Sequence, residues 1–351
     1  MPVTLKELAV RARVHPSTIS RVANHDPSLR IAQDTRQRIE ALLKETEYRP
    51  NGVARGLKLR QTFVLAVVIP DITNPFFAAL FRGVEDGASP HGYNVLLCNT
   101  DGSPERQRSH LQSLQTRRVD GVILASSFLK DPTVRWLRHQ HIPYVLVNRF
   151  SDEGQDPFVG SDDRVGGQVA TAHLAELSHR RIGHLAGKPT VSTGVMRRRG
   201  YLAALLEAGL RPDPGLVVES GYTEEGGAQA AERLFALEDR PTAIFAVTDM
   251  AAVGAYGVAR RMGLRVPEDV AIVGYNDIPL ASRMVPALTT VHVPIHDFGS
   301  VAAQLLLEQI ETGEPTRRRM VFNPELIVRG STVAGADNEP RLKVNPAFAT
   351  E

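Results

Sequence analysis

The apolar positions in most of the chain fall into short runs, separated by longer stretches with a helical pattern. From about residue 62 onward, eight such runs each have the length of a buried strand. They are Phe63–Ile69, Tyr93–Cys98, Val119–Ala125, Pro143–Val147, Ile182–Ala186, Leu216–Glu219, Ala243–Val247 and Val270–Gly274. Strands that alternate with helices are typical of parallel sheets covered on both faces. Eight strands divide into two sets of four, so we expect an α/β body with two Rossmann-like lobes.

The first 60 residues carry a helical pattern instead. Thr4 and Glu7 have the spacing of a capping box at the start of a first helix. Pro16 suits the first turn of a second helix, and a third is expected from about Asp34 to Thr46. The apolar positions expected to be buried are Leu5, Leu8, Ala9 and Ala12, then Ile19, Val22 and Ala23, then Ile39, Leu42 and Leu43. Two short helices with a tight turn, followed by a third, predict a small all-α helix-turn-helix unit.

The exposed face of the second helix is unusual in composition. It carries Ser17, Thr18, Ser20, Arg21 and Asn24. Serine and threonine are modest helix formers, and small hydroxyls around one arginine suit close approach to a surface rich in acceptors. The first 60 residues hold twelve Lys and Arg against six Asp and Glu, a charge of +6, which leaves −4 for the rest of a chain whose total is +2. A basic head on a mildly acidic body indicates a module that binds a polyanion such as nucleic acid.

Bulk composition narrows the class further. The chain has 351 residues, enough for two or three domains, and is 42% hydrophobic and 23% charged, an ordinary globular balance. One cysteine, Cys98, excludes an internal disulfide framework and fits a reducing compartment. The first residues lack the apolar segment of a secretory signal, and no apolar run reaches the length of a membrane span. We therefore expect a cytoplasmic protein with no membrane partner.

Two segments of the head make the pattern more specific. "VTLKELAVRARVHPSTISRVANHDP" and "DTRQRIEALLKETEYRPNGVARGLK" resemble the LacI/GalR family of bacterial transcription regulators, and the resemblance continues to about residue 333. It implies a helix-turn-helix head over 1–48, a hinge helix or linker over 49–60, and a two-lobed periplasmic-binding-protein-like domain over 61–333. The N-lobe would take about 61–160 plus 292–321 and the C-lobe about 162–290 plus 323–333, with crossings near Gly160–Asp163, Leu288–Val293 and Val321–Asn323. Residues 334–351, with two prolines and one leucine, are expected to be disordered and to leave the protein a homodimer.

The resemblance also implies which residues contact DNA. It places the second helix in the major groove, with Pro16, Ser17 and Arg21 at base-contacting positions. An arginine can donate two hydrogen bonds to guanine, worth roughly 1–3 kcal/mol of discrimination. Phosphate contacts, which set the register of binding, are implied for Thr18, Ser20 and Asn24. Thr4 is also expected to bind DNA. His15 departs from the serine or threonine that is common in the family.

The stretch "RPNGVARGLKL" has two readings. Two glycines weaken a helix by roughly 1 kcal/mol each, which fits a plain linker. In the family this segment becomes helical when two copies lie together in the minor groove. We therefore expect Leu57 to wedge between base pairs at a central CG step, with Ala54 and Lys58 also contacting DNA.

Residues just after the strands are candidates for a ligand cleft, because ligands bind beyond the carboxyl ends of parallel strands. The resemblance assigns effector contacts to Asn74, Phe76, Asn148, Asp162, Arg197, Tyr222, Asp249 and Asp277. Carboxylates together with an arginine suit the vicinal hydroxyls of a sugar. Asn148, Asp163 and Thr248 differ from the residues usual in the family, so a nucleobase or small acid that acts as a co-repressor stays open as the alternative effector.

An enzyme and a secreted solute-binding protein are the remaining alternatives. The chain has no G-x-G, no G-x-S-x-G and no P-loop. Pro294 separates His292 from His296, which argues against a helical metal pair. We expect no catalysis, cofactor or metal. The sequence instead predicts a repressor that binds a roughly palindromic, double-stranded operator as a homodimer under the control of a small molecule, most plainly a sugar or sugar derivative.

Overall fold

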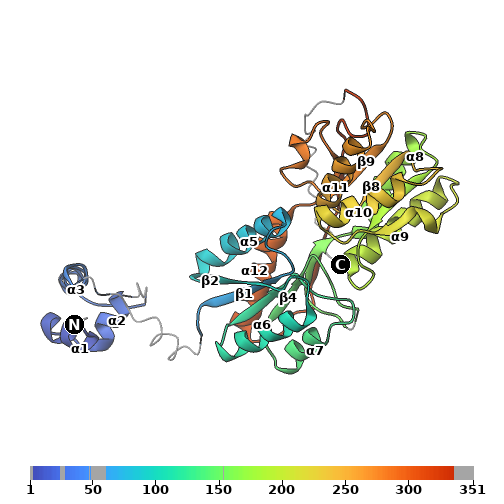
Figure 1. The fold of residues 1–351 in the computed structure, drawn as a ribbon. Helices are drawn as coiled ribbons and strands as arrows, with labels where there is room; N and C mark the ends of the chain where they lie inside the picture. The colour runs from blue at the N-terminus through green and yellow to red at the C-terminus, as the bar shows by residue number, and fades with distance from the viewer. Residues whose placement is uncertain (1–2, 24–27, 47, 49–60, 153, 336–351) are drawn as a thin grey trace. The chain divides into compact units, whose positions relative to one another are not determined.

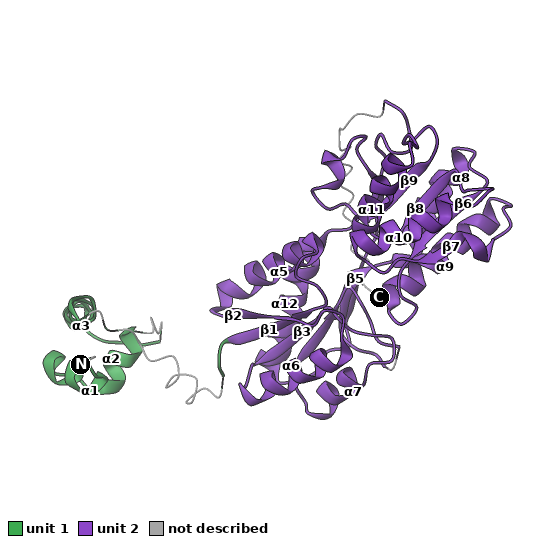
Figure 2. Cartoon of the chain, in the orientation of Figure 1, with its two compact units in different colours: residues 1–63 green, residues 64–351 purple. Residues whose placement is uncertain are grey.

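The computed structural model describes residues 3–23, 28–46, 48, 61–152 and 154–335. The chain forms two compact units, residues 1–63 and residues 64–351 (Figure 2). The predicted hinge residues Ala54, Leu57 and Lys58, the helix-face residue Asn24 and residues 336–351 of the predicted tail lie outside the described residues.

The first unit is the predicted helix-turn-helix. Its helices are α1 (Leu5–Ala12), α2 (Pro16–Ala23) and α3 (Gln33–Glu45). The capping box is present, since the Glu7 N–H donates to Thr4 Oγ1 at 3.3 Å and the Thr4 N–H donates to Glu7 Oε2 at 2.8 Å. A small core of Leu8, Ala9, Ala12, Ile19, Val22, Leu29 and Ile39 joins the three helices. Four residues that the pattern places in the core are only half-buried at its edge: Leu5, Ala23, Leu42 and Leu43.

The first lobe of the second unit is built on a parallel sheet in the order β11-β5-β4-β3-β1-β2. Figure 1 labels β1, β2 and β4 of this sheet. Its strands are β1 (Val64–Ile69), β2 (Asn94–Asn99), β3 (Gly121–Leu124), β4 (Tyr144–Val147), β5 (Phe158–Ser161) and β11 (Arg319–Phe322). Its helices are α5 (Pro75–Ala88), α6 (Pro104–Thr116), α7 (Pro132–His139) and α12 (Ile295–Thr312). Helices α5 and α12 pack closely together, and α6 and α7 contribute to one apolar cluster with the strands.

The second lobe repeats this arrangement with the sheet order β12-β10-β9-β8-β6-β7. Its strands are β6 (Ile182–Ala186), β7 (Val217–Glu219), β8 (Ala243–Ala246), β9 (Ala271–Asn276), β10 (Thr289–His292) and β12 (Glu325–Ile327). Its helices are α8 (Asp163–Glu176), α9 (Ser192–Glu207), α10 (Glu224–Phe235) and α11 (Asp249–Arg261). Only β12 among these described strands runs antiparallel to its neighbour. The α/β prediction is therefore confirmed.

The number of strands in each sheet was predicted wrongly. All eight apolar runs are strands, but each sheet has six strands rather than four. The four additional strands lie at the three crossings between the lobes. Strand β5 ends the first lobe before α8, β10 ends in the second lobe before α12, and β11 is followed directly by β12 in the other sheet. The crossing segments thus also extend the sheets that they connect.

Helix pairs within each lobe approach closely where a glycine leaves room. A Cβ atom built at Gly167 on α8 would lie 2.3 Å from the Arg197 carbonyl oxygen of α9. A side chain there would push the two helices apart. None of the helices in the described part of the chain has the length and apolar character that crossing a membrane requires.

Candidate functional site

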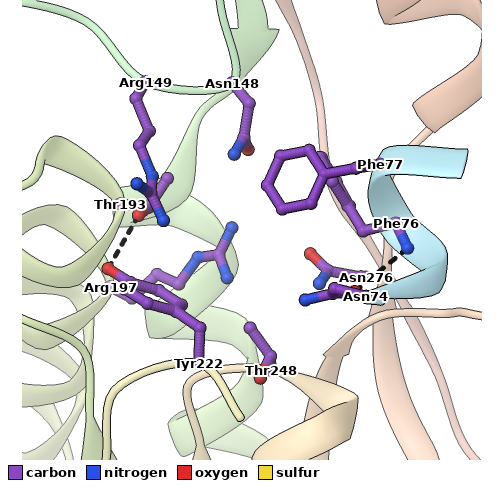
Figure 3. Close-up of a pocket in the computed structure, with 10 residues that line it drawn as sticks. All are labelled: Asn74, Phe76, Phe77, Asn148, Arg149, Thr193, Arg197, Tyr222, Thr248 and Asn276. Carbon is purple, nitrogen blue, oxygen red and sulfur yellow. Dashed lines mark hydrogen bonds between the residues drawn. The ribbon is translucent and has the colours of Figure 1, made fainter. Parts of the chain in front are cut away.

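Two adjoining cavities lie at the carboxyl ends of strands from both lobes. The inner cavity is about 20 Å³, room for about one water molecule. It is lined by Asn74, Phe76, Phe77, Asn148, Arg149, Thr193, Arg197, Tyr222, Thr248 and Asn276 (Figure 3). The outer cavity is about 560 Å³, within the usual range for a small-molecule site, and it shares Asn74, Phe77, Arg149 and Tyr222 with the inner one.

Hydrogen bonds connect the two lobes beside these cavities. The Phe150 N–H, after β4 of the first lobe, donates to Ser192 Oγ at the start of α9 at 3.0 Å. The Leu129 N–H donates to the Thr190 carbonyl oxygen at 2.9 Å. The cavities are therefore enclosed by parts of both lobes that are already in contact.

Four helices begin at the cavities. Asn74 caps α5, Thr223 caps α10 and Thr248 caps α11 through their side-chain oxygens. Helix α9 begins beside Thr193, and within the described part of the chain no side chain caps it. Because the first N–H groups of a helix carry partial positive charge, each of these four helix ends contributes donors that favour a negatively charged group.

Arg197 on α9 is held by the second lobe. Its Nε donates to Asp163 Oδ1 at 2.8 Å and its Nη1 donates to the Val247 carbonyl oxygen at 2.6 Å. The guanidinium also lies 3.6 Å from the centre of the Tyr275 ring. Burial alone would lower the pKa of Arg197, but the Asp163 carboxylate raises it above its ordinary value. Arg197 is therefore a fixed, charged donor at the wall of the inner cavity.

Arg149 follows β4 in the first lobe and lies over Tyr222 of the second, 4.9 Å from the ring centre. Its side chain is buried, and its Nε has no hydrogen-bond partner among the described residues. Burial lowers the pKa of Arg149. The Tyr222 hydroxyl is hydrogen-bonded to Thr193 Oγ1 at 3.0 Å, which fixes the ring beneath the guanidinium.

Five of the eight predicted effector residues come together at this site. They are Asn74, Phe76, Asn148, Arg197 and Tyr222, and all of them line the inner cavity. Figure 3 shows them arriving from different elements, with the phenylalanines on α5 opposite Asn148 and Arg149.

The three predicted carboxylates are not among the described residues that line either cavity. Asp162 caps α8 by accepting hydrogen bonds from the Arg164 and Val165 N–H groups. Asp249 and Asp277 also lie at strand ends, but their carboxylate oxygens are bound by other groups of the protein.

Asp249 accepts hydrogen bonds from Thr290 Oγ1 at 2.5 Å and the Ile278 N–H at 2.8 Å. Burial raises the pKa of Asp249 to about 7. Asp277 lies 2.8 Å from Arg329 and 3.1 Å from His292. Burial would raise the pKa of Asp277, but these two partners lower it below its ordinary value.

The sequence pattern did not assign five other lining residues to the site. They are Phe77, Arg149, Thr193, Thr248 and Asn276. The sequence marks Thr248 only as a departure from the residues usual in the family. The signal that could have found Arg149 is its position directly after Asn148, at the end of the same strand.

The face of α2 that the sequence predicts to be exposed is only partly exposed among the described residues. Ser17 and Arg21 are exposed, whereas Pro16, Thr18 and Ser20 are half-buried. Arg21 Nη2 donates to Ser28 Oγ at 2.9 Å. Thr4 is exposed while its oxygen caps α1. His15 supplies a cap that the sequence did not reveal, since its Nδ1 accepts the Ser17 N–H at 3.2 Å in the first turn of α2.

Comparison with known proteins assigns both units. Residues 4–51 match the model of the lacI family of bacterial regulatory proteins, and residues 171–332 match a periplasmic binding protein-like domain. The ribose operon repressor of Escherichia coli (strain K12) is 35% identical over 329 residues, which are 93% of this chain and 99% of that protein.

Solved structures of transcriptional regulators are also similar to this chain. A complex of the transcriptional regulator CelR with cellobiose has a TM-score of 0.73 at 33% identity, covering 94% of this chain and 99% of that one. The lac repressor dimer bound to operator and the anti-inducer ONPF has a TM-score of 0.85 at 25% identity, covering 95% and 100%. These relatives are regulators rather than enzymes, as the sequence predicts. The chain therefore belongs to the LacI family of bacterial regulatory proteins and is a DNA-binding transcriptional repressor that responds to an effector.

Proposed function

We propose that this repressor binds a palindromic operator as a cytoplasmic homodimer, and that a sugar or sugar derivative in the cleft between its lobes controls that binding. The observation that carries the proposal is the pair of adjoining cavities at the strand ends, in a chain that also carries an exposed helix-turn-helix face. The relative that represses a ribose operon and the regulator solved with cellobiose are consistent with a carbohydrate.

The lining chemistry supports a sugar. Phe76, Phe77 and Tyr222 supply apolar ring faces, on which the C–H face of a sugar can pack. Asn148, Arg197 and Asn276 supply donors and acceptors for hydroxyl groups. Asp162, Asp249 and Asp277 stay predictions as effector ligands, and to bind an effector their oxygens would have to exchange the protein partners that they have in this structure.

Coupling to DNA would pass through the crossing strands. Because β5, β10 and β11 each continue into the other lobe, a ligand that draws the lobes together must shift these crossings. We propose that this shift alters the dimer and determines whether the hinge residues of two copies can meet in the minor groove, with Leu57 as a wedge and Ala54 and Lys58 beside it. Whether the effector releases or tightens DNA depends on which lobe arrangement it binds better.

On the head, Arg21 is the proposed base reader, with Pro16 and Ser17 beside it. Thr4, Thr18, Ser20 and Asn24 are proposed to contact the DNA backbone. In the structure Arg21 Nη2 donates to Ser28 Oγ at 2.9 Å, so a base contact made by that nitrogen requires it to exchange Ser28 for guanine.

The test is fluorescence anisotropy with an operator selected from random DNA by the purified protein. Arg21→Ala should weaken operator binding by about fivefold to 150-fold, since a bidentate arginine–guanine pair is worth about 1–3 kcal/mol, and leave binding to random DNA nearly unchanged. Arg11→Ala, an equal loss of charge at an exposed position of α1, is the matched control. Equal losses on operator and random DNA would reduce Arg21 to a phosphate contact.

The effector arm uses the same assay. Tyr222→Ala should keep operator affinity and lose the response to the sugar that shifts wild-type binding. A Tyr222→Ala variant that folds and responds at the wild-type sugar concentration would show that the effector site lies elsewhere.

A further inference from the structure

The buried residues around the inner cavity carry an unbalanced positive charge. Two guanidinium groups, Arg149 and Arg197, line this cavity, whereas its described lining contains no aspartate or glutamate. Asp163 lies behind Arg197 and is paired with it at 2.8 Å. The Arg197 charge is therefore compensated and the Arg149 charge is not.

Arg149 is 6% exposed, and its Nε has no hydrogen-bond partner among the described residues. The charged side chains that act on it are Arg197, which repels it, and Asp163, which is already engaged. Among the described residues its guanidinium lies over the ring of Tyr222, 4.9 Å from the ring centre. Burial of a cation without an anionic partner is unfavourable unless something else supplies the missing charge.

The acidic residues of the outer cavity do not supply that charge. Asp101 is exposed and paired with Arg106, and Asp71 accepts hydrogen bonds from Thr73. Glu219 is exposed to solvent. Asp101 and Glu219 therefore lie in water, where their interactions are weakened by solvent and salt, and the half-buried Asp71 is already engaged by Thr73.

The backbone at the start of α9 also favours an anion at this site. Helix α9 begins beside Arg149 and Arg197, and no described side chain caps it. Its first N–H groups favour an anion. Asn148, the residue before Arg149, is an amide and adds no negative charge.

We propose that the effector is an anion: a sugar derivative whose carboxylate or phosphate is bound by Arg149 over the Tyr222 ring, while the sugar occupies the outer cavity. The proposal rests on the function proposed above and specifies the chemical class of its ligand. Arginine suits this role because its planar fork donates two parallel hydrogen bonds to a carboxylate or phosphate.

The experiment uses the full chain, dialysed free of small molecules, in thermal-shift and calorimetric titrations at constant ionic strength. The probes are matched sets: ribose with ribonate and ribose 5-phosphate, glucose with glucuronate and glucose 6-phosphate, and inorganic phosphate and acetate alone. The acid and phosphate of each set distinguish the two sources of negative charge. Variants are Arg149→Gln, Arg149→Lys and, as a control of equal charge change, Arg198→Gln at an exposed position of α9.

The wild type should bind an anionic member of a set about tenfold to a hundredfold more tightly than its neutral sugar, as expected for charge-assisted hydrogen bonds. Arg149→Gln should abolish that preference, Arg149→Lys should keep part of it, and Arg198→Gln should not change it. Without ligand, Arg149→Gln should melt at a higher temperature than the wild type, because it removes the uncompensated charge.

A neutral sugar that binds at least as tightly as its acid and phosphate overturns the proposal and leaves the sugar-responsive repressor standing. The proposal is also wrong if phosphate, acetate and the sugar anions stabilise the wild type no more than Arg149→Gln. If phosphate or acetate binds through Arg149 while no sugar of either charge adds to it, the anion site stands and the sugar assignment fails.

Discussion

Removing the charge of Asp163 gives the sharpest test of how the cleft is held. Asp163→Asn keeps the size of the side chain but leaves the Arg197 guanidinium, 2% exposed, without its anionic partner. Breaking a buried pair from one side costs about 3–5 kcal/mol. Arg197 would retain the Val247 carbonyl at 2.6 Å and the Tyr275 ring at 3.6 Å. We therefore expect the lower end, about 3 kcal/mol.

The assay is urea unfolding of the full chain, followed by circular dichroism at 222 nm, which reports the large α/β unit. Fluorescence of the single tryptophan, Trp136 on α7, reports whether the loss spreads from the second lobe to the first. Arg197→Met and the double variant complete a cycle. The double variant should lose less than the two single losses added together, because it leaves no lone buried charge. An Asp163→Asn loss below about 1 kcal/mol, or additive losses, would refute this account of the pair.

Three further predictions concern other parts of the chain. Asp249 has a folded pKa of about 7 against an ordinary 3.8, so its contribution to stability is full below pH 4 and is lost as the pH rises to 7. The unfolding free energy of the wild type relative to Asp249→Asn should therefore fall by about 1.4 kcal/mol per pH unit between pH 5 and 6.5, and a flat difference would contradict the raised pKa. Gly167→Ala should destabilise the second unit by about 1–3 kcal/mol in urea because its Cβ would meet the Arg197 carbonyl oxygen. Gly257→Ala on α11 is the control, because its Cβ would meet only the end of the Arg261 side chain at 3.8 Å, and it should stabilise the second unit by up to about 1 kcal/mol. Similar effects of Gly167→Ala and Gly257→Ala on the unfolding free energy would show that α8 and α9 can adjust. His15→Ala should lower the melting temperature of the head by removing the cap on α2, a loss of about 1 kcal/mol, and His15→Ser should restore it; an unchanged His15→Ala head would mean that the ring contributes nothing as a cap.

Periodicity predicts strands well where both faces of the strand are buried. Strands β1, β3 and β4 are apolar almost throughout and stand out in the sequence. Strands β11 and β12 are largely exposed or half-buried edge strands with charged residues, so no apolar run marks them. Their pairing is set by the crossings between lobes, which involve segments that are distant in sequence.

The sequence likewise predicts part of the candidate site and not the rest. Position after a strand correctly brings Asn74, Asn148 and Tyr222 to one edge of the sheets, because parallel strands all end on the same side. The same rule selects Asp249 and Asp277 equally well. It does not show that the first accepts hydrogen bonds from Thr290 and Ile278 and that the second pairs with Arg329. A side chain at a strand end binds a ligand only if the protein leaves its polar atoms available, and that depends on residues far away in sequence.

Asn148 and Arg149 show how backbone and charge combine at such a position. Asn148 has φ +63°, and the Arg149 N–H donates to the Val147 carbonyl oxygen at 2.6 Å, so the chain turns sharply as β4 ends. Asparagine tolerates this left-handed conformation better than most residues. The backbone conformation therefore favours asparagine at position 148, whether or not its side chain contacts a ligand. The turn delivers the next side chain into the cavity, where Arg149 meets an aromatic ring and no described carboxylate within ion-pairing distance. An amide at the turn followed by an unpaired guanidinium leaves the negative charge of this site to be supplied by the ligand.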